Sequence, residues 1–104
     1  MKFYKIVDVS VPRYPVLRLT FNDGFVGDVD FTDVIGRGGV MALLRDLSVF
    51  SRVEIGEHGR SLGWVDEHGD DIDFCADALR FQAEETVVRE RAARFEAARQ
   101  TAAE

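Results

Sequence analysis

Hydrophobic and polar residues alternate along the first third of the chain, which is the pattern of half-buried β-strands. Residues 16–21 show it best, with Leu17, Leu19 and Phe21 on one face and polar side chains on the other. The alternation predicts strands over residues 3–11, 16–21 and 25–31. In the first of these, four apolar residues share the face opposite Ile6, namely Phe3, Val7, Val9 and Val11.

Turn residues and a change of pattern divide the rest of the first 75 residues. Asn22-Asp23-Gly24 is a hairpin signal, because glycine adopts positive φ without steric cost. The glycines of residues 36–39, GRGG, end the third strand, and residues 40–47 contain enough helix formers for one short helix. Alternation then predicts strands over residues 49–55, 61–66 and 72–74. The expected body is therefore one antiparallel sheet of five to six strands with one short helix.

The hydrophobic period becomes helical from Ala76 to the end of the chain. Phe81, Val88 and Phe95 recur every seven residues and form one slowly drifting stripe. A helix of about 28 residues is about 42 Å long, whereas a small domain is about 30 Å across. We therefore expect Phe81 and Val88 to dock on the sheet and Phe95 to project beyond it. The predicted fold is α+β, with an α+β domain over residues 1–80 and a projecting continuation of the C-terminal helix over residues 81–104.

The net charge of the chain favours some classes of partner over others. Of 104 residues, 13 are basic and 19 acidic, a net charge of −6. Residues 1–78 hold 8 basic and 14 acidic residues, whereas residues 79–104 hold five of each. Nucleic-acid binding needs a positive face, so an acidic body argues against it and favours a basic protein partner. The arginines of the last helix do not change this, because they alternate with acids.

Composition also bears on location. No run of about 18 apolar residues occurs, so no membrane span is expected. The single cysteine cannot form an internal disulfide, which predicts a reducing, cytoplasmic environment.

Residues 66–71, DEHGDD, raise the question of a metal site. Asp66, His68 and Asp70 have the alternating spacing of a calcium-binding loop. Such a loop needs glycine at its sixth position, where this chain has Asp71, and a helix before it, where this chain has a strand. We interpret the segment as a solvated acidic connection and expect no metal and no cofactor.

Cys75 is the main candidate for catalysis, because it lies near the start of the last helix, where a thiolate is stabilised. Asp73 and Asp77 flank it and oppose a thiolate, so a buried structural cysteine is the favoured interpretation. The alternative function is a small-ligand-binding or thiol-dependent enzyme that uses Cys75 with His68. The GRGG segment with Arg37 could hold an anion, but it matches no phosphate-binding fingerprint.

The order of short motifs resembles the bacterial family called domain of unknown function 2442. The matching residues are Phe21-Asn22-Asp23-Gly24, Gly27, Asp30, Leu44-Arg45-Asp46, Phe50, Leu62, Trp64 and the run from Asp71 to Leu79. Two features depart from the family: a longer turn over residues 64–70, and a helix that continues past residue 80. The resemblance implies a small α+β domain without established catalytic residues, often encoded beside small partner proteins as in toxin–antitoxin pairs.

These observations together predict a non-enzymatic protein-interaction module, antitoxin-like or inhibitor-like. It would bind a protein partner, such as a neighbouring gene product, through an acidic sheet face and the C-terminal helix. A homodimer through the same helix is the other expected assembly. The helix residues expected at the contact are Val88, Arg91, Ala92, Phe95, Ala98 and Arg99.

Overall fold

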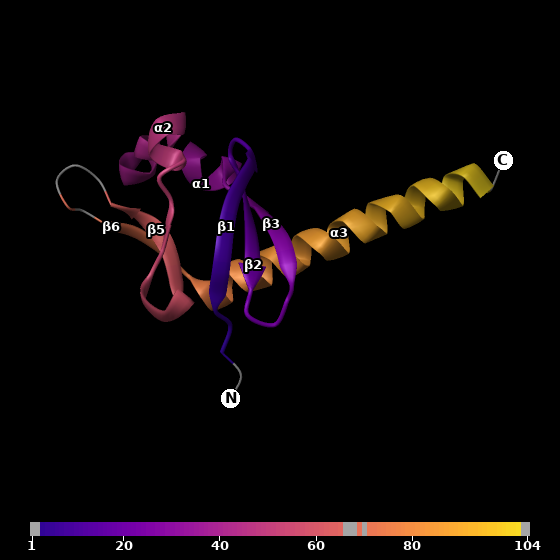
Figure 1. The fold of residues 1–104 in the computed structure, drawn as a ribbon. Helices are drawn as coiled ribbons and strands as arrows, with labels where there is room; N and C mark the ends of the chain where they lie inside the picture. The colour runs from indigo at the N-terminus through magenta and orange to yellow at the C-terminus, as the bar shows by residue number, and fades with distance from the viewer. Residues whose placement is uncertain (1–2, 66–68, 70, 103–104) are drawn as a thin grey trace.

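The computed structural model describes residues 3–65, 69 and 71–102. It contains six strands in two three-stranded antiparallel sheets, followed by one long C-terminal helix (Figure 1). The predicted α+β class is therefore confirmed. The prediction of a single sheet is wrong, because β1-β2-β3 and β4-β5-β6 form separate ladders.

The first sheet consists of β1 (Ile6–Arg13), β2 (Val16–Phe21) and β3 (Val26–Asp30). Leu17, Leu19 and Phe21 of β2 are fully buried, as their alternation predicts. The predicted hairpin also forms, with Gly24 at φ 91° in the turn between β2 and β3. Because this turn holds Asp23 at the sheet's end, it also positions a carboxylate for the last helix.

A β-bulge in β1 changes the predicted faces of that strand. Ile6 pairs with Phe21, but Asp8 pairs with the next residue, Thr20, so β1 contains one extra residue there. The bulge puts Ile6 in the core and leaves Val7 57 % exposed. The predicted grouping of Val7 with Val9, opposite Ile6, is therefore wrong. Simple alternation does not allow for an extra residue in the strand.

Three short helical segments separate the two sheets. They are α1 (Thr32–Gly36), the 3₁₀ helix η1 (Gly39–Arg45) and α2 (Leu47–Phe50). The predicted strand over residues 49–55 is wrong except at β4 (Glu54–Ile55). Its first residues belong to α2 because Asp46 caps that helix, accepting a hydrogen bond from the Ser48 N–H at 2.9 Å. The helical turn brings Phe50 fully into the core.

The second sheet is completed by β5 (Ser61–Val65) and β6 (Asp71–Cys75), with the short 3₁₀ helix η2 (Glu57–Gly59) between β4 and β5. Leu62 and Trp64 point inward as predicted. Trp64 stacks edge-on or tilted with Phe31, Phe50 and Phe74, at centroid distances of 5.4–6.3 Å within this cluster. Its indole N–H donates to the Phe50 carbonyl at 2.8 Å. This cluster ties both sheets and α2 into one core.

Gly63 in the middle of β5 is a sensitive point of the second sheet. A Cβ atom there would lie 2.1 Å from the Ile72 carbonyl oxygen and 2.8 Å from the Asp73 Cα. Gly63→Ala should therefore push β5 and β6 apart and lower the free energy of unfolding by about 1–3 kcal/mol. Gly36→Ala is the control, because its Cβ would meet nothing within 4 Å. Equal urea midpoints for the two variants would contradict the prediction.

Candidate protein-interaction surface

The C-terminal helix α3 (Ala76–Ala102) begins at the end of β6, crosses the first sheet and continues into solvent (Figure 1). Its 27 residues give the molecule extents of 59 × 34 × 20 Å. Within the described residues, no helix, α3 included, combines the length and hydrophobicity that crossing a bilayer requires.

The face of α3 that contacts the sheet differs from the predicted one. Ala76, Leu79 and Ala83 are buried, whereas Phe81 and Val88 are 69 % and 65 % exposed. The prediction that Phe81 and Val88 dock on the sheet is therefore wrong.

The physical reason is the closeness of the helix to β3. A Cβ atom at Gly27 of β3 would lie 2.9 Å from the Ala83 Cβ, so the two backbones approach where only small side chains fit. A helix turned to present Phe81 to the sheet would have to stand further away. The small residues therefore face inward, and the large apolar ones face solvent.

Arg80 anchors α3 to the hairpin between β2 and β3. Its side chain is only 9 % exposed, and its Nη1 donates to the Asp23 carboxylate at 2.9 Å. Its Nε donates to the Glu84 carboxylate, one helical turn later, at 2.8 Å. The hydrogen bond from Arg80 lowers the pKa of Asp23 to about 2. A buried cation is thus paired with two carboxylates.

Aromatic rings surround the same guanidinium. The Arg80 Cζ lies 4.1 Å from the ring centroid of Phe25, 4.4 Å from that of Tyr4 and 5.0 Å from that of Phe21. Cation–π contacts of this kind strengthen when the cation is shielded from water. The sequence motif Phe21-Asn22-Asp23-Gly24-Phe25 therefore supplies both the anion and two of the rings that hold Arg80.

A second contact fixes the first turn of α3. Arg60 donates two hydrogen bonds to Asp77, at 3.0 and 2.9 Å, and another to the Tyr4 carbonyl. The Tyr4 N–H also donates to Asp77 at 3.3 Å. The bond from Arg60 lowers the pKa of Asp77 below its ordinary value. The partner of Asp77 lies 17 residues earlier in the chain, a separation that gives no sequence signal.

Beyond these anchors, α3 forms an arm. Every side chain from Val88 to Arg99 is exposed, and Phe95 is 62 % exposed. The arm carries all six predicted contact residues, which are Val88, Arg91, Ala92, Phe95, Ala98 and Arg99. At 100° per residue, Val88, Ala92, Phe95 and Arg99 fall within a narrow arc, on the side of the helix opposite Ala83. The arm therefore presents a continuous stripe with a large aromatic ring at its centre.

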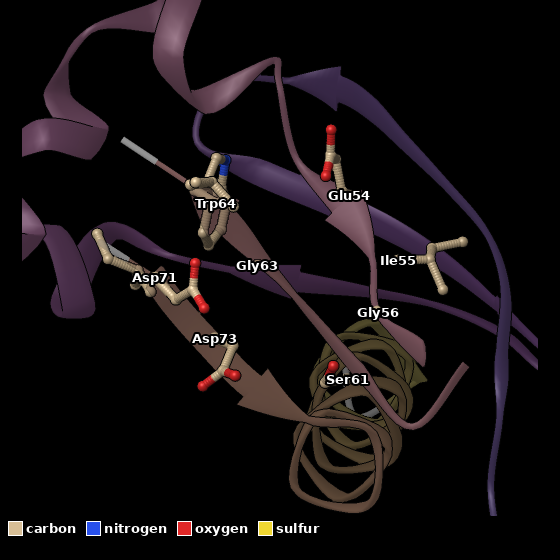
Figure 2. Close-up of a pocket in the computed structure, with 10 residues that line it drawn as sticks. Glu54, Ile55, Gly56, Ser61, Gly63, Trp64, Asp71 and Asp73 are labelled. Carbon is tan, nitrogen blue, oxygen red and sulfur yellow. The ribbon is translucent and has the colours of Figure 1, made fainter. Parts of the chain in front are cut away.

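The outer face of the second sheet is acidic. Glu54, Gly63 and Asp73 occupy one row across β4, β5 and β6, because the register pairs each with the next. Asp71 lies two residues from Asp73 on the same face, beside the exposed Val65. Figure 2 shows the acidic side chains on either side of Gly63, where they line a shallow hollow of about 160 Å³.

A second, polar groove of about 400 Å³ lies where α3 passes β3 and α1. Charges of both signs line it, with Asp30, Asp33 and Arg37 on one wall and Glu85 and Arg89 on the other. Arg89 already donates to Glu85 at 2.6 Å. Sequence reasoning missed this groove because its walls lie about 50 residues apart in the chain. It also places Arg37 beside carboxylates, which speaks against anion binding by GRGG.

Cys75 is exposed at the end of β6, so the prediction of a buried cysteine is wrong. It pairs with Ser61 on the same outer face as Asp73, because alternation along β6 puts residues two apart on one side. His68, Asp66 and Asp70 lie outside the described residues, so two expectations stay predictions: the solvated acidic connection, and the alternative of a thiol-dependent enzyme that uses Cys75 with His68. Within the part of the chain that the structure describes, no three His, Cys, Asp or Glu side chains are grouped as metal ligands.

Comparison of the chain with protein-family models, with curated proteins and with solved structures gave no match. The resemblance to domain of unknown function 2442 therefore stays a prediction. The arm and the acidic face are therefore the features of this chain that bear on its function.

The anchor at Arg80 predicts a specific response to acid. The pKa of Asp23 is about 2 in the folded chain, against about 3.9 when unfolded. The ion pair of Asp23 therefore contributes fully to the free energy of unfolding above about pH 4, and this contribution is lost as the pH falls towards 2. Asp23→Asn should lower the urea midpoint at pH 7, and the difference from wild type should shrink towards pH 2.

The control is Asp28→Asn, which removes the exposed pair between Asp28 and Arg18 on the outer side of the first sheet. Exposed ion pairs contribute little, so this variant should lose less stability at pH 7 than Asp23→Asn. A gap between Asp23→Asn and wild type that stays constant from pH 7 to pH 2 would contradict the assignment.

Proposed function

We propose that this protein is a non-enzymatic protein-interaction module, antitoxin-like or inhibitor-like. It binds a protein partner through the acidic outer face of the second sheet and through the arm of α3. The partner is a protein with a basic surface, and a neighbouring gene product is the first candidate.

The arm is the observation that carries this proposal. Soluble proteins seldom project a helix with a row of large apolar side chains, and exposed apolar surface rimmed by polar residues marks interaction sites. Here Phe95 and Val88 lie on such a helix, and Arg91 and Arg99 border them. Aromatic residues and arginines are the types most enriched at the energetic centres of protein interfaces.

The acidic face supports the same function in a different way. Among the described residues, no ion pair involves Glu54, Asp71 or Asp73. These carboxylates line a hollow that a basic side chain could enter. Charge complementarity of this kind mainly raises the association rate and selects among partners. The arm therefore provides most of the affinity, and the acidic face selects among partners.

The arm is tested with Phe95→Lys/Ala98→Lys. Tagged full-length protein is used to isolate a stoichiometric partner from the native host, and affinity is then measured with purified components. The double variant should weaken binding by about 100-fold, because two charges replace the apolar centre of the contact. An unchanged circular dichroism spectrum would show that the sheets remain folded. Full binding by this variant would remove the arm from the proposal.

The acidic face is tested with Asp73→Lys. This change should slow association and weaken binding by about 10-fold at low salt, and less at high salt. Asp8→Lys on β1 is the matched control, because it makes the same change of charge at an exposed site of the first sheet. Equal effects of the two substitutions would show that only net charge matters, and not this face.

A further inference from the structure

The arm of α3 has the residue spacing of a helix that pairs with another helix. Phe81, Val88 and Phe95 recur every seven residues, and the positions four residues after them hold Glu85, Ala92 and Arg99. This is the spacing of a coiled-coil seam, with Ala92 as the small apolar residue at its centre and charged residues at its two ends. This seam faces away from the sheet, since Ala83 and Leu79 fill the opposite side of the helix. A second helix can therefore lie along it without touching the core.

We infer that the occupant of this seam is the same arm of a second copy of this chain, in antiparallel orientation. The inference rests on the proposed function in one respect, namely that it takes the arm for an interaction surface. It adds that a second copy covers the arm in the free protein, so a partner that binds the arm has to displace that copy.

Size complementarity favours the antiparallel arrangement. In an antiparallel pair whose two-fold axis lies between residues 93 and 94, Phe95 of one copy packs over Ala92 of the other. By symmetry, Phe95 of the second copy packs over Ala92 of the first. A large ring then meets a small side chain twice. In a parallel pair each residue would instead meet its own counterpart, so Arg99 would face Arg99 and Glu85 would face Glu85.

Charge complementarity supports the same register. With that two-fold axis, Arg89 of one copy lies beside Glu96 of the other, and the symmetry repeats the contact. Arg89 pairs with Glu85 in its own chain at 2.6 Å, so Glu96 adds a second carboxylate to the same guanidinium. Among the described side chains of its own chain, the ion pair that Glu96 forms is a long one to Arg99, at 3.8 Å. Its carboxylate is therefore available to a partner. Arg99 itself reaches over its own Phe95 ring at 5.9 Å, and its stem can cover Val88 of the second copy.

The geometry leaves room for both bodies. The overlap covers residues 85–102, about 27 Å of helix, and the exposed part of the arm begins at Val88. The two bodies then lie at opposite ends of the paired arms.

The first test is sedimentation equilibrium of the purified full-length protein without any partner. We expect a reversible dimer with a dissociation constant on the order of 10 μM, as fits a small interface. Phe95→Glu should raise that constant by about 100-fold or more, because it buries a charge in two symmetric contacts. Phe81→Glu is the matched control: Phe81 is at least as exposed, but it lies outside the overlap, so the dimer should persist.

The second test determines the orientation. Arg89→Glu or Glu96→Arg alone should each weaken the dimer by about 10-fold, because like charges then meet across both symmetric contacts. The double variant Arg89→Glu/Glu96→Arg should restore wild-type affinity in the antiparallel pair. In a parallel pair, residue 96 would lie beside Arg91 and residue 89 beside Glu84, so the double variant would be weaker than either single one.

These outcomes separate the inference from the proposed function. A wild-type protein that is monomeric at all concentrations overturns self-pairing, yet leaves partner binding to be measured separately. A dimer that survives Phe95→Glu, or one that the double variant fails to restore, also overturns it. If the wild-type protein dimerises but binds no partner, that result would instead count against the proposed function alone.

Discussion

The buried guanidinium of Arg80 is the interaction on which the architecture depends. A charge at this depth is stable only if it is paired, and Asp23 and Glu84 provide the pairing while three aromatic rings exclude water around it. Asp23 lies in the turn between β2 and β3, so the pairing fixes the position of the helix against the sheet. The rotation of α3 about its own axis follows, because only one face of the helix can place residue 80 in that cage.

That rotation decides which side chains remain on the surface. With Arg80, Leu79 and Ala83 facing inward, the seven-residue stripe of Phe81 and Phe95 has to face solvent. Both anchors of α3, at Asp77 and Arg80, lie in its first two turns. The rest of the helix is consequently an arm whose apolar side chains are available to another protein. The exposed apolar stripe of the arm is thus a direct consequence of how the core is closed.

Local patterns predicted much of the fold correctly. The strand of residues 16–21, the Asn22-Asp23-Gly24 turn, the inward Leu62 and Trp64 and the long helix all depend on neighbours within a few residues. The failures occurred where distant parts of the chain compete for the same residues. Phe50 is drawn into a capped helical turn by the aromatic cluster around Trp64, and the β-bulge moves Ile6 into the core. For the candidate surface, the sequence predicted six contact residues on the arm, whose role stays a prediction, and it did not predict the groove beside α1.

The sequence by itself determined the α+β class, the acidic body and a helix too long for the body to cover. These properties follow from composition and from periods of two and 3.6 residues, which act locally. Only the tertiary structure decided that the strands form two sheets, that Cys75 is exposed and that the phenylalanine stripe faces solvent. Each of these depends on which backbones can approach each other closely, as at Gly27 and Ala83. That information is a property of pairs of residues far apart in the chain, and no stretch of sequence contains it.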